Sequence, residues 1–363
     1  MRQKPRSVLL IGLLGALVAG SAAAQQPEKP EASAPPKAPA PAAQPPRTNL
    51  IRPAPRAERA TPVRPFNADT DVRAAIEAAK ARAAADNKRV LVIWGDNASV
   101  WAPMMLECAQ RPGVATALLY HYEVVWADIG DPTIGPINLA ICQSYGADPA
   151  PETGRRAFPH ITIIESTGSE AGKAVVTRST KGLENERKLA AGQFDYNHLL
   201  VEDFLLDHKR EPLVAQQVLE KAKAEAKQRG LPLFLIFDEV ADGWCVRFRN
   251  WLAKPEVKPI FDRHFVVTRI DVNRMTDGFK LMDVYAGDRA ETSPWFLFCD
   301  VDDKRLAPVV GSEDDNLGFP TGEEIPRFVA MLRSVAPKLS DDEAKAIEAS
   351  LRAETEPKPV GKP

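Results

Sequence analysis

After residue 66, the chain carries one pattern of apolar and polar positions twice. In the first copy, Val72, Ile76, Ala79 and Ala83 recur at the spacing of an amphipathic helix, and the apolar run 89–94 follows. A short apolar run after a helical pattern is consistent with a buried strand. The first copy is therefore predicted to open with a helix and a central strand.

The second copy repeats this order. Its helical apolar positions run from Val214 through Val218 and Ala222 to Ala226, and the helix is expected to stop at Gly230, before the strand 231–237. Each copy then continues with a polar loop and a helix, followed by a strand, a short helix, a strand opened by proline and a terminal helix. These elements are predicted at 123–129, 139–145, 159–164 and 197–208 in the first copy, and at 265–271, 281–285, 294–298 and 323–332 in the second. The order predicts an α/β fold in which each copy is a mixed central sheet flanked by helices.

A further helix is predicted after the second copy. Ser340-Asp-Asp-Glu343 has the spacing of a capping box, and Ala344, Ile347 and Leu351 give the helix an apolar face. The chain thus divides into a signal segment, a linker, two repeats and an appended helix with a tail, at 1–24, 25–66, 67–210, 211–338 and 339–363.

The first 24 residues have the features of a secretory signal peptide. Arg2, Lys4 and Arg6 precede an apolar run at 8–20, and Ser-Ala-Ala-Ala at 21–24 offers a small-residue cleavage site. The sequence therefore predicts export to the periplasm, the cell envelope or the medium. Retention of the segment as a membrane anchor is the alternative.

Composition agrees with an exported globular protein joined to an extended linker. Twelve of the 32 prolines lie in 25–66, a Pro- and Ala-rich stretch with too few large apolar residues to fold. Its basic residues outnumber its acidic ones, which allows weak contact with an anionic surface. The whole chain carries a net charge of -2, so no basic stripe for nucleic acid is expected.

The second copy resembles the thioredoxin-like superfamily, and the first copy matches it in element order. Asp242-Gly-Trp-Cys-Val-Arg-Phe248 stands where that family carries Trp-Cys-x-x-Cys, and Pro159 and Pro294 match the family's cis-proline. The resemblance implies two tandem thioredoxin-like domains. It also implies a nucleophilic cysteine at a helix N-terminus, where the helix dipole favours the thiolate.

Both copies depart from the dithiol motif. Ser99 and Ala102 occupy the two cysteine positions of the first copy, and Phe248 replaces the resolving cysteine of the second. Cys245 alone remains, either as a nucleophile that forms mixed disulfides or as a cysteine packed at a helix start. Ser99 is expected to be a helix N-cap.

The family's buried acid is also replaced. Ile93 and Ile236 stand at its positions, and Glu239 or Asp242, from a loop longer than usual, are weak substitutes. By the resemblance, the substrate-contacting positions are Trp244, Ser293, Pro294, Trp295, Phe158 and Pro159. For Trp244 and Trp295, a plain core role is the alternative.

The remaining cysteines and the histidines suggest no further chemistry. Cys108, Cys142 and Cys299 occupy small apolar positions, so they are predicted to be unpaired core residues. The five histidines are scattered and lack zinc-ligand spacing, and the acidic loop 312–316 lacks calcium-ligand spacing. Neither a metal nor a cofactor is expected.

Two functions follow from these features. The first is an exported protein- or peptide-binding scaffold without dithiol redox activity, whose partner is an unidentified envelope protein or peptide. The second is a thiol-disulfide exchange factor that uses Cys245 alone. A structural role at the cell surface, suggested by the linker, is a weaker third.

The signal segment gives the first testable prediction. The exported protein should begin near Gln25, because Ala22 and Ala24 fit the small-residue cleavage positions. Intact-mass measurement of the protein from the envelope fraction checks this. A full-length mass there would show that the segment is retained.

Overall fold

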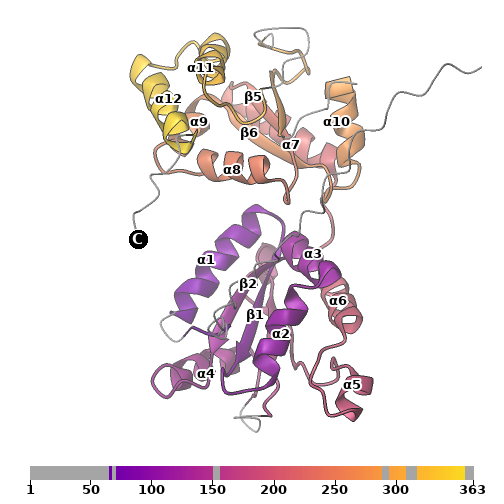
Figure 1. Ribbon diagram of the computed structural model, residues 1–363. Coiled ribbons are helices and arrows are strands. Elements are labelled where there is room, and N and C mark those ends of the chain that lie inside the picture. Colours follow the sequence, from indigo (N-terminus) through magenta and orange to yellow (C-terminus); the bar gives the residue numbers. More distant parts are fainter. Residues whose placement is uncertain (1–64, 68–70, 150–155, 288–293, 308–316, 356–363) are drawn as a thin grey trace, which may run out of the picture. The chain divides into compact units, whose positions relative to one another are not determined.

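The computed structural model describes residues 65–67, 71–149, 156–287, 294–307 and 317–355 (Figure 1). All of them belong to one compact unit of the chain, Ala60–Pro363. The predicted signal segment, most of the predicted linker, Ser293 and the acidic loop 312–316 lie outside the described residues.

The first half is built on a four-stranded mixed sheet with the order β2-β1-β3-β4. Its strands are β1 (Arg89–Gly95), β2 (Tyr122–Asp128), β3 (His160–Ile164) and β4 (Ala174–Ser179). β1 is parallel to β2 and antiparallel to β3, which in turn pairs with β4 in antiparallel fashion. Side chains alternate between the two faces along each strand, so each face needs its own cover of helices.

Helices cover both faces of this first sheet. They are α1 (Val72–Ala85), α2 (Trp101–Ala109), α3 (Pro112–His121), α4 (Gly135–Ser144) and α6 (His198–Asp207), while the short α5 (Glu186–Ala190) buries no residue. Side chains of α1 and α4 pack in one core with Val90, Val92 and Trp94 of β1. Those of α2, α3 and α6 pack in a second core with Leu91 and Ile93, which point to the opposite face.

The second half has a three-stranded mixed sheet with the order β6-β5-β7. Its strands are β5 (Leu233–Asp238), β6 (Val266–Asp271) and β7 (Trp295–Cys299). β5 is parallel to β6 and antiparallel to β7, so the three strands repeat the directions of β1, β2 and β3. The fold is thus α/β with two mixed sheets, as the sequence predicted.

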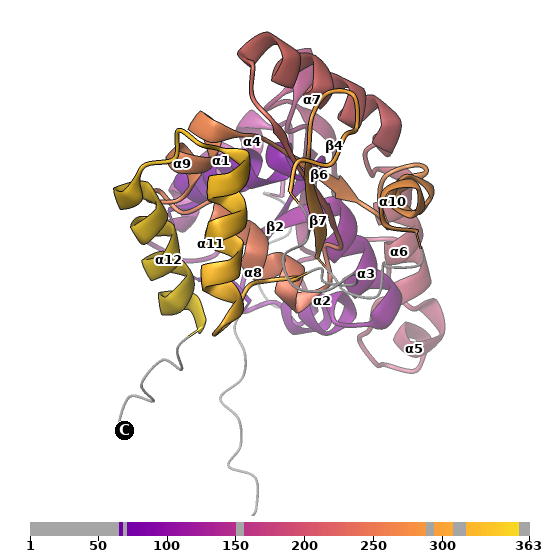
Figure 2. The same ribbon diagram turned by 90° about the horizontal axis from the view of Figure 1, so that it is seen from above.

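Six helices of the second half are described, α7 (Ala215–Arg229), α8 (Gly243–Leu252), α9 (Lys258–His264), α10 (Gly278–Ala286), α11 (Glu324–Val335) and α12 (Asp341–Thr355). Residues of α7 and α10 share a core with Leu233, Leu235 and Phe237. Residues of α8, α9, α11 and α12 share the other core with Phe234 and Ile236. Helix α12 lies beside α11 (Figure 2).

The predicted helical faces are correct in the first copy and shifted in the second. Val72, Ile76, Ala79 and Ala83 are all buried in α1. In α7, however, the buried residues are Ala215, Leu219, Ala222 and Ala226. Val214 precedes the helix with an extended backbone, because it forms an isolated parallel β-bridge with Thr276.

The predicted capping box at the start of α12 is confirmed. The Ser340 backbone N–H donates to the Glu343 carboxylate at 2.9 Å, and the Glu343 N–H donates to Ser340 Oγ at 3.2 Å. The hydrogen bond from Ser340 holds the pKa of Glu343 below its usual value. Ala344, Ile347 and Leu351 are buried and fasten the helix to the second core.

Within the residues that the structure describes, no helix has both the length and the apolar character needed to cross a membrane.

The capping box generates a stability prediction. Ser340→Ala should lower the free energy of unfolding by about 1 kcal/mol at pH 7, since the first turn of α12 loses its cap. Because the folded pKa of Glu343 is lowered, its part of this stabilisation is complete above the unfolded pKa of about 4.3 and lost as pH falls through the folded pKa.

Urea unfolding of the wild type and the variant at pH 7 and at pH 3 measures both effects. The difference between the two proteins should shrink at pH 3 without vanishing, because the bond to Ser340 Oγ does not need a charge. Lys345→Ala, at an exposed position of the same helix, is the matched control and should change stability by only a few tenths of a kcal/mol. An equal loss in both variants would contradict the role of the cap.

Candidate functional site

The candidate site lies at the start of α8, directly after the central strand β5. The loop that follows β5 ends at Asp242, whose extended backbone makes it the N-cap of α8. The Asp242 carboxylate accepts the backbone N–H of Cys245 at 2.8 Å. Asp242 therefore fixes the first turn of the helix. It is one of the two residues suggested as substitutes for the family's buried acid, and in the structure it acts as a helix cap.

Cys245 is placed like a nucleophile but is covered. It lies in the first turn of α8, and the backbone N–H of Glu239 points at its sulfur, with an N···S distance of 3.4 Å. The residue has 0% relative exposure. To attack a disulfide, the Cys245 sulfur must contact one of the two disulfide sulfurs. In this arrangement the sulfur is covered, so a substrate disulfide cannot reach it.

Phe248, at the resolving position, points into the aromatic core of the second half. Its ring is stacked on Trp251 at 5.7 Å and meets Phe234 and Phe296 at 6.1 and 5.9 Å. Residues three apart on a helix lie on the same face, so the burial of Phe248 also turns Cys245 inward. A cysteine at position 248 would lie inside this core.

Trp244, one residue before Cys245, faces outward. It is 48% exposed, and its ring is stacked on Phe319 with 6.0 Å between centroids. The Arg247 guanidinium lies 5.6 Å from the Trp244 ring and 5.4 Å from the Phe319 ring. Arg247 also donates to the backbone carbonyl of Glu354 in α12. We call the group formed by Trp244, Arg247 and Phe319 the Trp244 surface.

Of the two roles that the sequence left open for Trp295, the structure shows the core role. Trp295 is only 4% exposed and packs in the core on the α7 side of the sheet, 5.7 Å from Phe237. Side chains alternate along β7, so it is Phe296 that faces α8. Pro294, just before the strand, is buried.

The corresponding positions of the first half are closed by packing. Ser99 is buried, its hydroxyl donates to the carbonyl of Ala157, and it accepts the N–H of Trp101 at 3.1 Å. Ser99 thus bonds the start of α2 as predicted, although the cap position itself is Val100. The half-buried Phe158 stacks on Trp101 with 4.5 Å between ring centroids.

The other two positions of the first half are also covered, since Ala102 and Pro159 are both buried.

The other cysteines are core residues, as predicted. All four cysteines are buried thiols. Burial raises the pKa of Cys108 and of Cys299 to about 11, and that of Cys142 to about 12. Among the described residues, no group of His, Cys, Asp and Glu could hold a metal ion.

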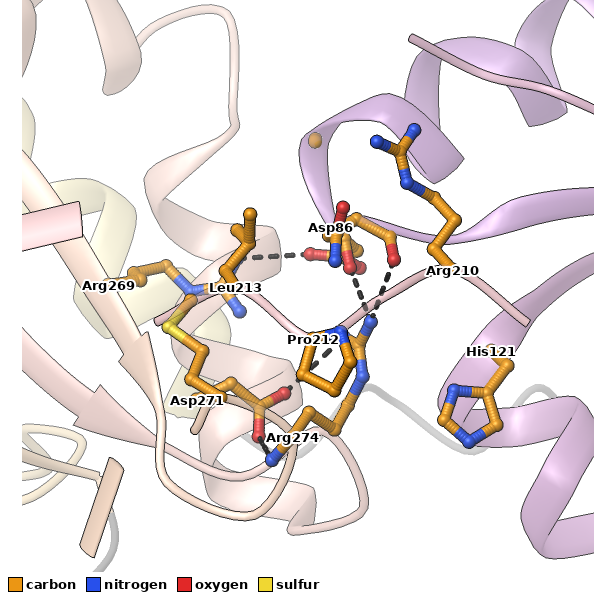
Figure 3. Close-up of a pocket in the computed structure, with 11 residues that line it drawn as sticks. Asp86, His121, Arg210, Pro212, Leu213, Arg269, Asp271 and Arg274 are labelled. Atoms are coloured by element: carbon orange, nitrogen blue, oxygen red, sulfur yellow. Dashed lines mark hydrogen bonds and ion pairs between the residues drawn. The ribbon is translucent and has the colours of Figure 1, made fainter. Parts of the chain in front are cut away.

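A buried charge network was missed by the sequence analysis. Arg269 on β6 donates to Asp238 at 2.8 Å and to Asp86, at the end of α1, at 3.2 Å. Arg274 donates to the carbonyl oxygen of Asp86 at 2.6 Å (Figure 3). Burial alone would raise the pKa of Asp86, but Arg269 holds it below the usual value. Asp238 and Asp271 end two parallel strands and are paired in register. An aspartate at the end of each apolar run was the feature of the sequence that could have indicated this network.

This network borders a cavity of about 70 Å³ that is also lined by His121, Arg210 and Leu213. Burial lowers the pKa of His121 to about 4, so its ring is neutral at pH 7. Arg210 is itself paired with Glu165 at 2.5 Å. Arg269 and Arg274 bond to Asp86 across the two halves, while Asp238 Oδ1 and Arg274 Nε are buried without a hydrogen-bond partner among the described residues.

Residues 214–301 match the model of a family described as thioredoxin-like. This segment contains β5, α8, β6 and β7, and therefore both Cys245 and Pro294. The segment 214–301 is thus similar to the thioredoxin-like family. The comparison with curated proteins found no match.

Several solved structures are similar to parts of the chain. A disulphide isomerase from Xylella fastidiosa Temecula1 is 24% identical, with 39% of this chain and 95% of that chain covered and a TM-score of 0.30. Human ERp44 is 14% identical, with coverage of 60% and 48% and a TM-score of 0.21. ERdj5 is 13% identical, with coverage of 63% and 25% and a TM-score of 0.22. This chain thus spans about half of ERp44 and a quarter of ERdj5.

The cap on α8 gives a labelling prediction. Asp242→Ala should destabilise the first turn of α8 by about 1 kcal/mol, and the rate at which iodoacetamide alkylates Cys245 in the native protein should rise about fivefold. Mass spectrometry of peptides after timed labelling measures this. Asp283→Ala, at an exposed position of α10, is the control and should leave the rate unchanged. Rapid labelling of Cys245 in the wild type would contradict its burial.

Proposed function

We propose that this chain is an exported protein with two tandem thioredoxin-like domains, and that it binds a protein or peptide partner without dithiol redox chemistry. The segment 1–24 would direct export, and the Pro-rich stretch 25–66 would separate the folded part from the membrane or wall. The partner would be an envelope protein or peptide.

The repeated strand directions support the tandem arrangement. In each half a central strand, β1 or β5, has one parallel and one antiparallel neighbour, and each is followed by a helix that starts at the degenerate motif. The two halves differ after the third strand, where β4 extends only the sheet of the first half within the described residues.

The observation that carries the non-catalytic proposal is the closed face of α8. Cys245 is inaccessible, Phe248 fills the resolving position with a core side chain, and Ser99 and Ala102 leave the first half without sulfur at its motif. Dithiol exchange needs an exposed attacking thiolate and a second thiol within reach of it. Neither is present at these positions.

The Trp244 surface is the part of this site that remains available for binding. It combines a half-exposed indole and a guanidinium beside it, backed by the buried ring of Phe319. Such a group offers a flat apolar face together with hydrogen-bond donors, which suits an extended peptide segment. In the proposed role, Trp244 contributes the largest contact area.

Monothiol exchange through Cys245 is the second candidate. The N–H of Glu239 that points at the sulfur, and the helix N-terminus beside it, favour negative charge on that atom. In this reaction the Cys245 thiolate would attack a partner disulfide, form a mixed disulfide and release one partner thiolate. An external thiol would then free Cys245. This path requires that the loop before α8 move away from the sulfur.

Two assays on the full chain separate the candidates. The protein should reduce insulin disulfides no faster than buffer with the same amount of dithiothreitol, and incubation with an excess of oxidised glutathione should give no adduct at Cys245 in the native state. Intact mass and insulin turbidity are the readouts, with Cys245→Ser as the matched control. Turnover well above the control would refute the non-catalytic proposal, and an adduct lost in Cys245→Ser would favour the monothiol.

The matched test of binding is Trp244→Ala. It should weaken partner binding at least tenfold in calorimetry while leaving the unfolding transition unchanged, because the indole is half exposed. Phe248→Cys is a poor test of restored redox activity, since loss of the buried ring would cost about 3 kcal/mol or more.

A further inference from the structure

Phe66 is held in a built recess at the start of the described chain. It is only 2% exposed, although it lies just before the first repeat. Its backbone N–H donates to Asn97 Oδ1 at 3.3 Å, and its carbonyl oxygen accepts from Asn97 Nδ2 at 2.7 Å. One carboxamide therefore pairs with both main-chain groups of a single residue.

The recess is shaped around the phenyl ring. Trp126 on β2 meets the ring edge to face, with 5.5 Å between centroids and an interplanar angle of 64°. A Cβ on Gly95 would lie 2.2 Å from the ring's Cζ, so a larger residue at the end of β1 would force the Phe66 ring to move. We call the recess formed by Gly95, Asn97 and Trp126 the Phe66 socket.

The orientation of the Asn97 side chain is fixed by hydrogen bonds other than those to Phe66. Asn97 Nδ2 also donates to the buried carboxylate of Asp128 at 3.2 Å. Asp128 is held in turn by the backbone N–H groups of Gly130 and Asp131, at 2.8 and 2.9 Å. The carboxamide thus keeps its orientation toward the main chain of Phe66.

We propose that the Phe66 socket is a peptide-docking site of the first half, occupied in cis by Phe66, and that it accepts the same kind of segment from another polypeptide when Phe66 is withdrawn. The contacts from Asn97 and Trp126 involve only the ring and the main chain of Phe66. A phenylalanine of another polypeptide could make the same contacts. The site is separate from the Trp244 surface, so it stands independently of the proposed function.

The chemistry of the ligand follows from the walls. The ring recess takes a phenylalanine, and the Asn97 carboxamide pairs with the main-chain N–H and carbonyl of that same residue. An open hollow of about 580 Å³ beside the socket is lined by Asp96, Asp128 and Asp131. These carboxylates favour a basic residue close to the phenylalanine, as in the chain's own sequence Arg-Pro-Phe-Asn at 64–67.

The test uses the full chain and a fluorescein-labelled peptide, Val-Arg-Pro-Phe-Asn-Ala-Asp, which copies residues 63–69. In fluorescence anisotropy, the Phe66→Ala chain should bind this peptide at least tenfold more tightly than the wild type, whose socket is filled. The same peptide with alanine in place of phenylalanine should bind neither protein. Adding Asn97→Ala to Phe66→Ala should abolish binding while the circular dichroism spectrum stays that of a folded protein.

Gly95→Ala is the matched control, because its methyl group would overlap the position of the ring tip and so narrow the socket. It should therefore displace the Phe66 ring without creating a binding site for the peptide. Phe66→Leu keeps an apolar side chain in the socket, so it should bind the peptide with intermediate affinity. This variant replaces Phe66→Ala in the test if Phe66→Ala does not fold. Absence of binding to a folded Phe66→Ala or Phe66→Leu chain would overturn the proposal. Equal binding to the wild type, or to Gly95→Ala, would do the same by placing the peptide elsewhere.

Discussion

The packing of Phe248 is the constraint on which the candidate site depends. Cys245 and Phe248 are one helical turn apart, so they share a face of α8, and the aromatic core formed with Phe234, Trp251 and Phe296 draws that face inward. The thiol is buried as a consequence, and Trp244 is left outside. A single replacement at the resolving position therefore changes both the chemistry of the motif and the surface that it presents.

In the first half, the start of the helix after the central strand is also covered, but by different contacts. There the Ser99 hydroxyl is bonded to the carbonyl of Ala157, and Trp101 is covered by Phe158. These contacts tie the start of α2 to the segment before β3, where the resembling family binds substrate. In both halves, packing and hydrogen bonds close the start of the helix that follows the central strand.

Much of the fold could be predicted because its central strands are continuous apolar runs. The run 89–94 became β1, and Gly230 ended α7 with the left-handed backbone that glycine adopts readily. Strand β4 was missed because an edge strand is half exposed on both faces and so lacks such a run.

The site was harder to predict, since it depends on which face each residue takes. The pattern around Trp244 and Trp295 allowed either orientation, and only the pairing of β7 with β5 shows that Trp295 points away from α8. The bonds of Arg269 to Asp86 and of Asn97 to Phe66 join residues far apart in sequence, for which no local pattern exists.

The most direct test of the closed site is the urea dependence of Cys245 alkylation. If the thiol is reached only when the second half unfolds, its rate should rise with urea in parallel with that of Cys299 in the core of the same half, and both slopes should match the global unfolding transition. A Cys245 rate that is independent of urea at low concentration, and orders of magnitude above that of Cys299, would contradict the account.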